Sequence, residues 1–98
     1  MIVHFRQLES FFTNCFHEDW EHDFADDAAA IRYYLDVALP EQVEGVRTEL
    51  DAMLALAPRL SEDDLETVLI VDLGCSYDPT EDGLTRANWL RSVRARLE

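Results

Sequence analysis

The sequence predicts an all-α fold, a small single-domain bundle of four to five helices spanning residues 1–98. Apolar residues recur at steps of three and four along most of the chain, which is the spacing of one helical face. Capping residues begin most of these stretches, and Gly or Pro ends them. VLIVDL is rich in branched residues, but it lies between a capping motif and a closing glycine. No stretch therefore requires a strand.

The first expected helix runs from His4 to Phe16 and the second begins at Asp26 or Asp27, since either carboxylate can cap it. Pro40 ends the second helix and suits the first turn of a third. The apolar face of the first helix comprises Phe5, Leu8, Phe11, Phe12, Cys15 and Phe16. The inward residues of the second are Ile31, Tyr34, Leu35 and Ala38.

The third helix is expected to end near Pro58, and the fourth to start at Ser61. Ser61 can accept a hydrogen bond from the backbone of Asp64, whose carboxylate can reach back, and Gly74 supplies the closing residue. Leu60 and Leu65 suit a hydrophobic staple across this start. The apolar stripes are Val43, Val46, Leu50, Met53, Leu54 and Ala57 in the third helix, and Leu65, Val68, Leu69 and Leu73 in the fourth.

The segment CSYDPTEDGL is predicted to be an ordered loop, because it holds the turn signals Asp-Pro and Asp-Gly. Thr85 then caps a last helix, with Leu84 and Trp89 placed as a second staple and Leu90, Val93 and Leu97 continuing the stripe. The predicted core comprises Phe5, Leu8, Phe12, Phe16, Trp20, Leu50, Leu54, Leu65, Leu69, Trp89, Leu90 and Val93.

The chain is strongly acidic: 21 Asp and Glu stand against 8 basic residues, all Arg, for a formal charge of -13. Nucleic acid is an unsuitable ligand, since binding it requires basic side chains that neutralise phosphates. The charge is uneven, because residues 86–98 hold four Arg and one acid. Such acidity either serves solubility alone or speeds encounter with a basic partner.

The opening residues MIVHFRQLES lack the apolar core of a signal peptide, and no run approaches a membrane span, so we expect a cytoplasmic protein without membrane contact. Cys15 and Cys75 are the only cysteines. In a reducing compartment two isolated thiols are more often buried small hydrophobes than a disulfide.

The stretch CFHEDWEHDF raises the question of a metal or acid/base site. On one helix, His17 and His22 would be turned about 140° apart, so they could not hold one ion together. His17 and Glu21 would share a face, but one His with carboxylates lacks the ligand count of a structural zinc site. We expect no metal, cofactor or enzyme activity, and a metal-dependent enzyme built on His17, Glu21 and His22 remains the less favoured alternative.

Carboxylates also form two groups. The group after the first helix comprises Glu18, Asp19, Glu21, Asp23, Asp26 and Asp27, and the group in the loop before the last helix comprises Asp78, Glu81 and Asp82. Sequence does not tell whether these groups adjoin in space. Trp20, in the first group, either completes the core or anchors an interface. The candidate partner-binding residues are Glu18, Asp19, Glu21, Asp23, Asp78, Glu81 and Asp82, chosen for their charge.

Nearly the whole chain resembles the immunity proteins of bacterial contact-dependent growth inhibition systems. The resemblance is carried by FFTNCFHEDWEHDF, by LPEQVEGVRTELDAMLALAPRLSEDDL and by LGCSYDPTEDGLTRANWLRSVRARL. Its most specific parts are Phe16 to Trp20, Leu73-Gly74-Cys75, Tyr77-Asp78-Pro79, and Gly83-Leu84-Thr85 followed by Trp89-Leu90. The resemblance implies a small helical cytosolic protein that blocks the toxic C-terminal domain of a delivered effector.

The charge independently suits that role, because nuclease toxins have basic clefts that carboxylates can occupy in place of phosphates. Complementary charge raises association rates toward about 10⁸ to 10⁹ M⁻¹s⁻¹ at low salt. We therefore expect a one-to-one complex with a cognate toxin domain of the nuclease class, with no chemistry by this chain. An acidic regulatory module that binds another basic protein is the alternative.

Overall fold

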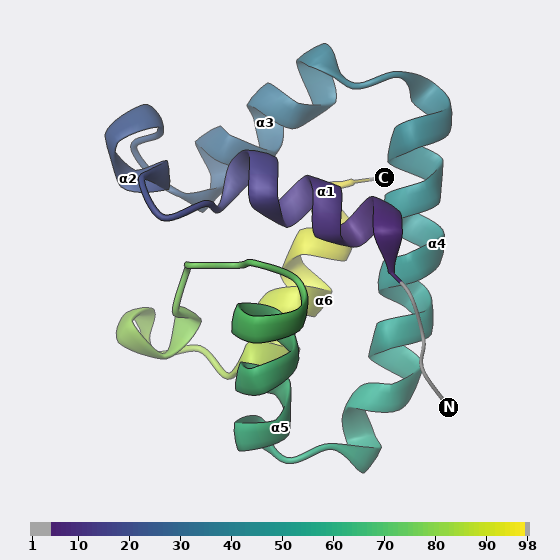
Figure 1. Cartoon of the computed structure of the whole chain (residues 1–98), viewed down its shortest axis with the longest axis vertical. Helices are drawn as coiled ribbons and strands as arrows, with labels where there is room; N and C mark the ends of the chain where they lie inside the picture. The colour runs from purple at the N-terminus through teal and green to yellow at the C-terminus, as the bar shows by residue number, and fades with distance from the viewer. Residues whose placement is uncertain (1–4, 98) are drawn as a thin grey trace.

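The chain folds into α-helices joined by short turns, as the sequence predicts (Figure 1). The computed structural model describes residues 5–97, and no strand occurs in that range. His4, the expected start of the first helix, lies outside the described residues. The α-helices are α1 (Arg6–Cys15), α2 (Trp20–Asp23), α3 (Asp27–Val37), α4 (Pro40–Leu56), α5 (Glu62–Thr67) and α6 (Arg86–Arg96). Shorter turns are η1 (Ala57–Arg59), η2 (Val68–Asp72) and η3 (Pro79–Asp82).

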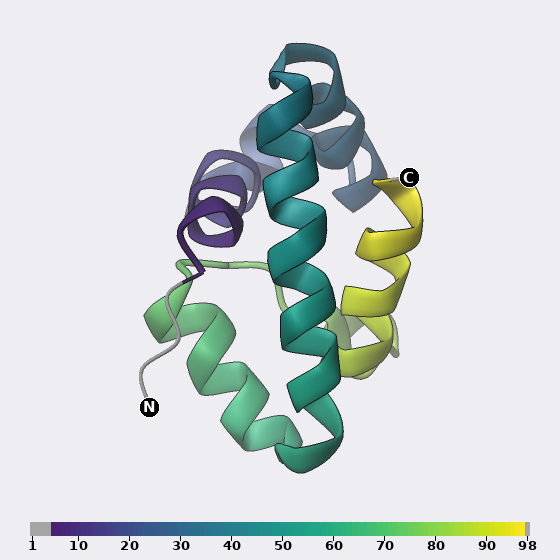
Figure 2. The same ribbon diagram turned by 90° about the vertical axis from the view of Figure 1, so that its right-hand side faces the viewer.

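Helix α4 is the longest element and packs against both α1 and α6. Helix α1 also contacts α3, and α6 also contacts α5 and η3. Figures 1 and 2 show α4 running along one side of the molecule, with α2 and η3 at the opposite side. This arrangement brings η3, late in the chain, to the same end of the molecule as α2.

The helix starts follow the predicted capping chemistry. The side chain of Asp26 accepts a hydrogen bond from Ala29 N–H at 2.8 Å, and Pro40 is the first residue of α4. Ser61 and Asp64 form the expected reciprocal pair, at 3.0 and 3.2 Å. The last helix is capped by Thr85 as predicted. These local contacts set where each helix begins and therefore which faces meet.

Most of the predicted core is buried. Phe5 and Leu54 are only partly buried, against the edge of the core. Leu35, expected inside, is 37% exposed because Ile31 and Tyr34 already fill the buried face of α3. Leu84, expected to staple onto Trp89, is 40% exposed. The core residues that are confirmed as buried are Leu8, Phe12, Phe16, Trp20, Leu50, Leu65, Leu69, Trp89, Leu90 and Val93.

Aromatic rings connect the end of α1 to the loop before α6. The Phe16 and Trp20 ring centroids lie 5.4 Å apart, those of Trp20 and Tyr77 5.2 Å, and those of Tyr77 and Trp89 4.9 Å. All three pairs have edge-to-face geometry, which ring quadrupoles favour. Trp20 is therefore part of the core, the more favoured of its two predicted roles.

The segment after α5 departs from the predicted regular helix. Val68–Asp72 forms a π-helical turn, and Gly74 then takes a left-handed conformation with φ of 69°. A Cβ atom at Gly74 would lie 2.8 Å from Thr13 Cγ2, so the chain passes close to α1 here. The Ser76 N–H donates to the Phe16 carbonyl oxygen at 2.7 Å. This bond joins the loop to the end of α1.

Candidate partner-binding site

Acids of both groups line one pocket of about 500 Å³. One wall comes from α2 and the start of α3, and the other from the loop and η3. The lining residues are Trp20, Glu21, Ala25, Asp26, Asp27, Ser76, Tyr77, Asp78, Glu81 and Asp82. Acids of the two groups, which are distant in sequence, therefore adjoin in space across this pocket.

The carboxylates on the α3 side of the pocket have structural partners. Asp26 caps α3. Asp27 Oδ2 accepts from the indole N–H of Trp89 at 3.0 Å and lies 3.7 Å from Arg96 Nη1. These two acids therefore hold α3 and α6 in place as well as lining the pocket.

On the opposite wall, Asp78 is held by Thr80 and Arg86. Its Oδ1 atom accepts from the hydroxyl and the N–H of Thr80 and lies 3.3 Å from Arg86 Nη2. The Thr80 hydroxyl, then the Thr80 N–H and the Arg86 charge, lower the pKa of Asp78 below its ordinary value. Asp78 is therefore a firmly ionised carboxylate.

Tyr77 forms the aromatic part of the pocket lining. Its hydroxyl donates to Asp82. Burial, then the hydrogen bond to Asp82 and the negative charges of Asp82, Asp27 and Asp78, raise the pKa of Tyr77. The hydroxyl therefore stays protonated and remains a donor. Tyr77 was not among the candidate residues predicted from the sequence, although it directly precedes the turn signal Asp78-Pro79.

The remaining candidate acids differ in their surroundings. Within residues 5–97, the side chains of Glu21 and Glu81 have no hydrogen bond or ion-pair partner, and they stand on opposite walls. Glu18 and Asp19 are exposed residues between α1 and α2, outside the pocket lining. Asp23 also lies outside the lining and accepts from His17.

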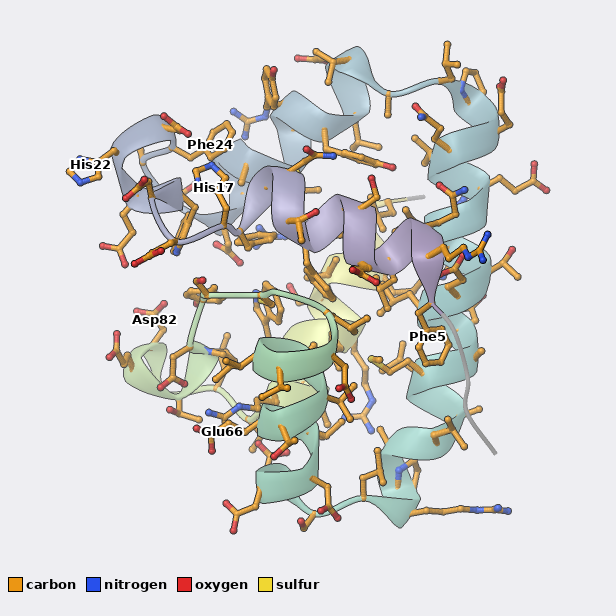
Figure 3. All side chains as sticks on the ribbon, in the orientation of Figure 1. Phe5, His17, His22, Phe24, Glu66 and Asp82 are labelled. Atoms are coloured by element: carbon orange, nitrogen blue, oxygen red, sulfur yellow. The ribbon has the colours of Figure 1, made fainter. Side chains whose placement is uncertain are left out.

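His17 and His22 do not sit on one helix, because the chain bends between α1 and α2. Asp19 N–H lies 3.1 Å from His17 Nδ1, and His17 Nε2 lies 3.0 Å from an Asp23 oxygen. Figure 3 shows the His22 ring at the outer edge of the molecule, pointing away from His17. In the described part of the chain, no three His, Cys, Asp or Glu side chains lie together as metal ligands would.

The arginines of α6 do not form a free basic end. Arg86 is 7% exposed and lies among Glu62, Glu66 and Asp78, with nitrogen–oxygen distances of 4.0, 3.9 and 3.3 Å. Arg94 Nε donates to Asp51 at 2.7 Å. Arg86 and Arg94 therefore pair with acids of other elements, as Arg96 does with Asp27, whereas Arg91 donates to Asn88.

Cys15 and Cys75 are free and buried, as predicted. Burial raises the pKa of each thiol to about 12. Both side chains are therefore neutral at physiological pH and act as small apolar groups.

None of the helices in residues 5–97 combines the length and the apolar composition that crossing a membrane requires.

A search of the curated proteins found no match. One chain of the crystal structure of a CdiA-CT/CdiI complex from Y. kristensenii 33638 has the same fold, with a TM-score of 0.86 and 23% sequence identity. That match covers 96% of this chain and 98% of the other. Residues 4–97 match the family described as CdiI immunity protein. Because this match spans almost the whole sequence, the chain belongs to the CdiI immunity protein family.

Proposed function

We propose that this protein neutralises the toxic C-terminal domain of a contact-dependent growth inhibition effector in the cytoplasm. It does so by binding the domain one to one, without chemistry of its own. The acidic pocket and the neighbouring carboxylates form the contact surface. The observation that carries the proposal is the meeting of two acidic groups, distant in sequence, at one pocket in a member of this family.

Charge supports this choice of surface. The arginines nearest the pocket, Arg86 and Arg96, are already paired with Asp78 and Asp27. Glu18, Asp19, Glu21 and Glu81 have no such partner among the described residues, so the end of the molecule that carries α2 and η3 keeps an excess of negative charge. A basic surface gains from this field during encounter, and the gain falls as salt screens it.

A nuclease is the class of toxin that fits such a surface. Its substrate cleft must attract phosphates, and it therefore presents basic side chains. Carboxylates positioned in that cleft occupy the place of the phosphates and exclude the substrate. Lasting protection depends on slow release, which comes from a few well-packed contacts rather than from long-range charge.

Co-expression tests the role directly. The C-terminal domain of the effector encoded beside this chain is induced in cells with and without the protein, and we expect growth only when the protein is present. An acidic regulator of another cellular protein would give no protection. In vitro, purified toxin domain is incubated with RNA and DNA, and we expect equimolar protein to stop the cleavage.

Stopped-flow association at increasing salt tests the surface. We expect the association rate to fall steeply between about 10 mM and about 500 mM salt, as screening of exposed charges requires. An association rate that does not change with salt would contradict binding through the acidic surface, although protection in cells would still stand.

A further inference from the structure

Trp20 carries a polar group without a partner. Its side chain is 7% exposed, yet within residues 5–97 no atom accepts a hydrogen bond from its indole N–H. Trp89, the other tryptophan, donates to Asp27 at 3.0 Å. Buried indole N–H groups usually have an acceptor, so the free donor of Trp20 is unusual.

The Trp20 N–H is not fully enclosed. In the described residues no fully enclosed side-chain nitrogen or oxygen lacks a partner, so the Trp20 N–H must retain some open surface. Trp20 lines the pocket, and the rest of its ring packs against Phe16 and Tyr77. Because Trp20 is part of the lining, its open N–H is a hydrogen-bond donor beside the pocket carboxylates.

The carboxylates themselves are unequally satisfied. Asp26, Asp27, Asp78 and Asp82 each accept hydrogen bonds from this chain. Glu21 and Glu81 are the two lining acids without a partner in the described residues, and they lie on opposite walls. Two carboxylates of the pocket thus have no cation as a partner, and one indole N–H has no acceptor.

A basic residue within a peptide segment supplies both, through its side chain and its main-chain carbonyl. Arginine suits the pocket better than lysine, because its planar guanidinium can pair with two carboxylates and stack on aromatic rings. Tyr77 provides such a ring in the lining. A volume of about 500 Å³ also leaves room for a side chain of this size.

We propose that the pocket receives an arginine side chain of the toxin domain. Glu21 and Glu81 pair with its guanidinium, and the Trp20 N–H donates to a main-chain carbonyl oxygen of the same segment. This inference rests on the proposed function and names the chemical group that the acidic surface recognises.

A charge-matched pair of variants tests the glutamates. Glu21→Gln/Glu81→Gln removes two charges from the pocket, and Glu41→Gln/Glu44→Gln removes two exposed charges from α4, on the opposite side of the molecule. Each pair includes one first-turn glutamate, so the effects on helix ends are comparable. The dissociation constant for the toxin domain encoded beside the chain is measured for both pairs and the parent.

We expect the pocket pair to weaken binding at least tenfold, mainly through faster dissociation, and the α4 pair to change it less than twofold. Equal losses, or no loss in the pocket pair, would overturn the proposal. Thermal melts of both pairs are compared with that of the parent to verify folding. If the parent neither binds nor protects, the proposed function itself fails, which is a separate result.

Two further substitutions identify the groups that meet. Trp20→Phe keeps a ring but removes the N–H, and we expect severalfold weaker binding. On the toxin, each arginine is replaced by lysine, and one replacement should weaken binding tenfold in the parent complex but have little further effect with the pocket pair. Additive losses for every toxin arginine would show that none enters the pocket and would refute the inference.

Discussion

The indole N–H of Trp89 donates to the Oδ2 atom of Asp27 at 3.0 Å. Trp89 is fully buried in the core, whereas Asp27 lines the acidic pocket. A single hydrogen bond thus links the interior of the bundle to the surface proposed to meet the toxin. The stability of the core and the shape of the pocket are therefore coupled through Asp27.

Asp27→Ala is expected to lower the free energy of unfolding by about 1 to 3 kcal/mol, because it leaves the buried Trp89 N–H without an acceptor. Asp27→Asn keeps an acceptor oxygen and should cost less. Urea denaturation of both variants measures the difference. Equal losses would mean that the charge of Asp27, rather than its hydrogen bond, stabilises the fold.

Trp89→Ala is expected to cost about 3 to 5 kcal/mol, since it truncates an aromatic side chain with no exposed surface. A loss of this size is a large fraction of the stability of a small domain. Thermal unfolding measures it, with Tyr33→Ala, at a ring that is 51% exposed, as the control. A melting temperature equal to that of the parent would contradict the core described above.

The lowered pKa of Asp78 predicts acid sensitivity. A carboxyl group whose pKa is lower in the folded state than in the unfolded state stabilises the fold at pH values above the ordinary aspartate pKa of about 4. This stability is lost as the pH falls through the lowered pKa. Thr80→Val removes the hydrogen bond that contributes most to the lowered pKa of Asp78. The free energy of unfolding of this variant should therefore fall less steeply with pH below about pH 5. Thr48→Val, at an exposed position on α4, should leave the slope unchanged. The free energy of unfolding is measured at each pH.

The raised pKa of Tyr77 predicts the opposite dependence in base. The folded state holds the phenolic proton more tightly than the unfolded state, so stability is complete below a pH of about 10 and falls as the pH rises above it. Tyr77→Phe should reduce the fall in the free energy of unfolding at alkaline pH. At neutral pH it should cost about 0.5 to 1.5 kcal/mol, because the hydrogen bond to Asp82 is lost. Urea titrations near pH 7 and pH 11 would reveal both effects, and a parallel decline in the variant would contradict them.

Gly74 and Gly83 both have positive φ, of 69° and 79°, so alanine at either is strained by about 1 to 2 kcal/mol. Only at Gly74 does a Cβ atom also meet a neighbour, Thr13 Cγ2 at 2.8 Å, whereas the space at Gly83 is open. Gly74→Ala should therefore cost more than Gly83→Ala in chemical denaturation. Adding Thr13→Ser, which removes that methyl group, should recover the difference, and failure to recover it would point to strain alone.

The sequence predicted the helices well because their signals are local. Ser61 with Asp64, Asp26, Thr85 and Pro40 act within one turn, so spacing and residue type identify them. Exposure was harder to predict, since it depends on neighbours from distant elements. Leu84 followed the staple pattern but stays 40% exposed, while Trp89 is covered by Phe12, Phe16 and Tyr77.

Of the predicted candidate acids, Glu21, Asp78, Glu81 and Asp82 line the pocket, whereas Glu18, Asp19 and Asp23 lie outside the lining. Asp26 and Asp27 line the pocket but were not among the candidates, and the pocket itself was not predicted. Its shape requires the contacts between α6 and η3 and the bond from Ser76 to Phe16, which no periodicity encodes. The short helix α2 and the 3₁₀ turn η3 were missed for a related reason: each has too few turns to show an apolar stripe. The unpartnered N–H of Trp20 is likewise a property of the assembled fold.

The two walls of the pocket come from opposite ends of the chain, residues 20–27 and 76–82. Translation delivers the first wall early and the second only after most of the bundle has been made. A ribosome-bound chain that stops short of α6 has the early acids but neither Trp89 to hold Asp27 nor Arg86 to hold Asp78. Under the proposed function, a cell's protection then depends on its stock of finished molecules, not on those still being synthesised when a toxin arrives.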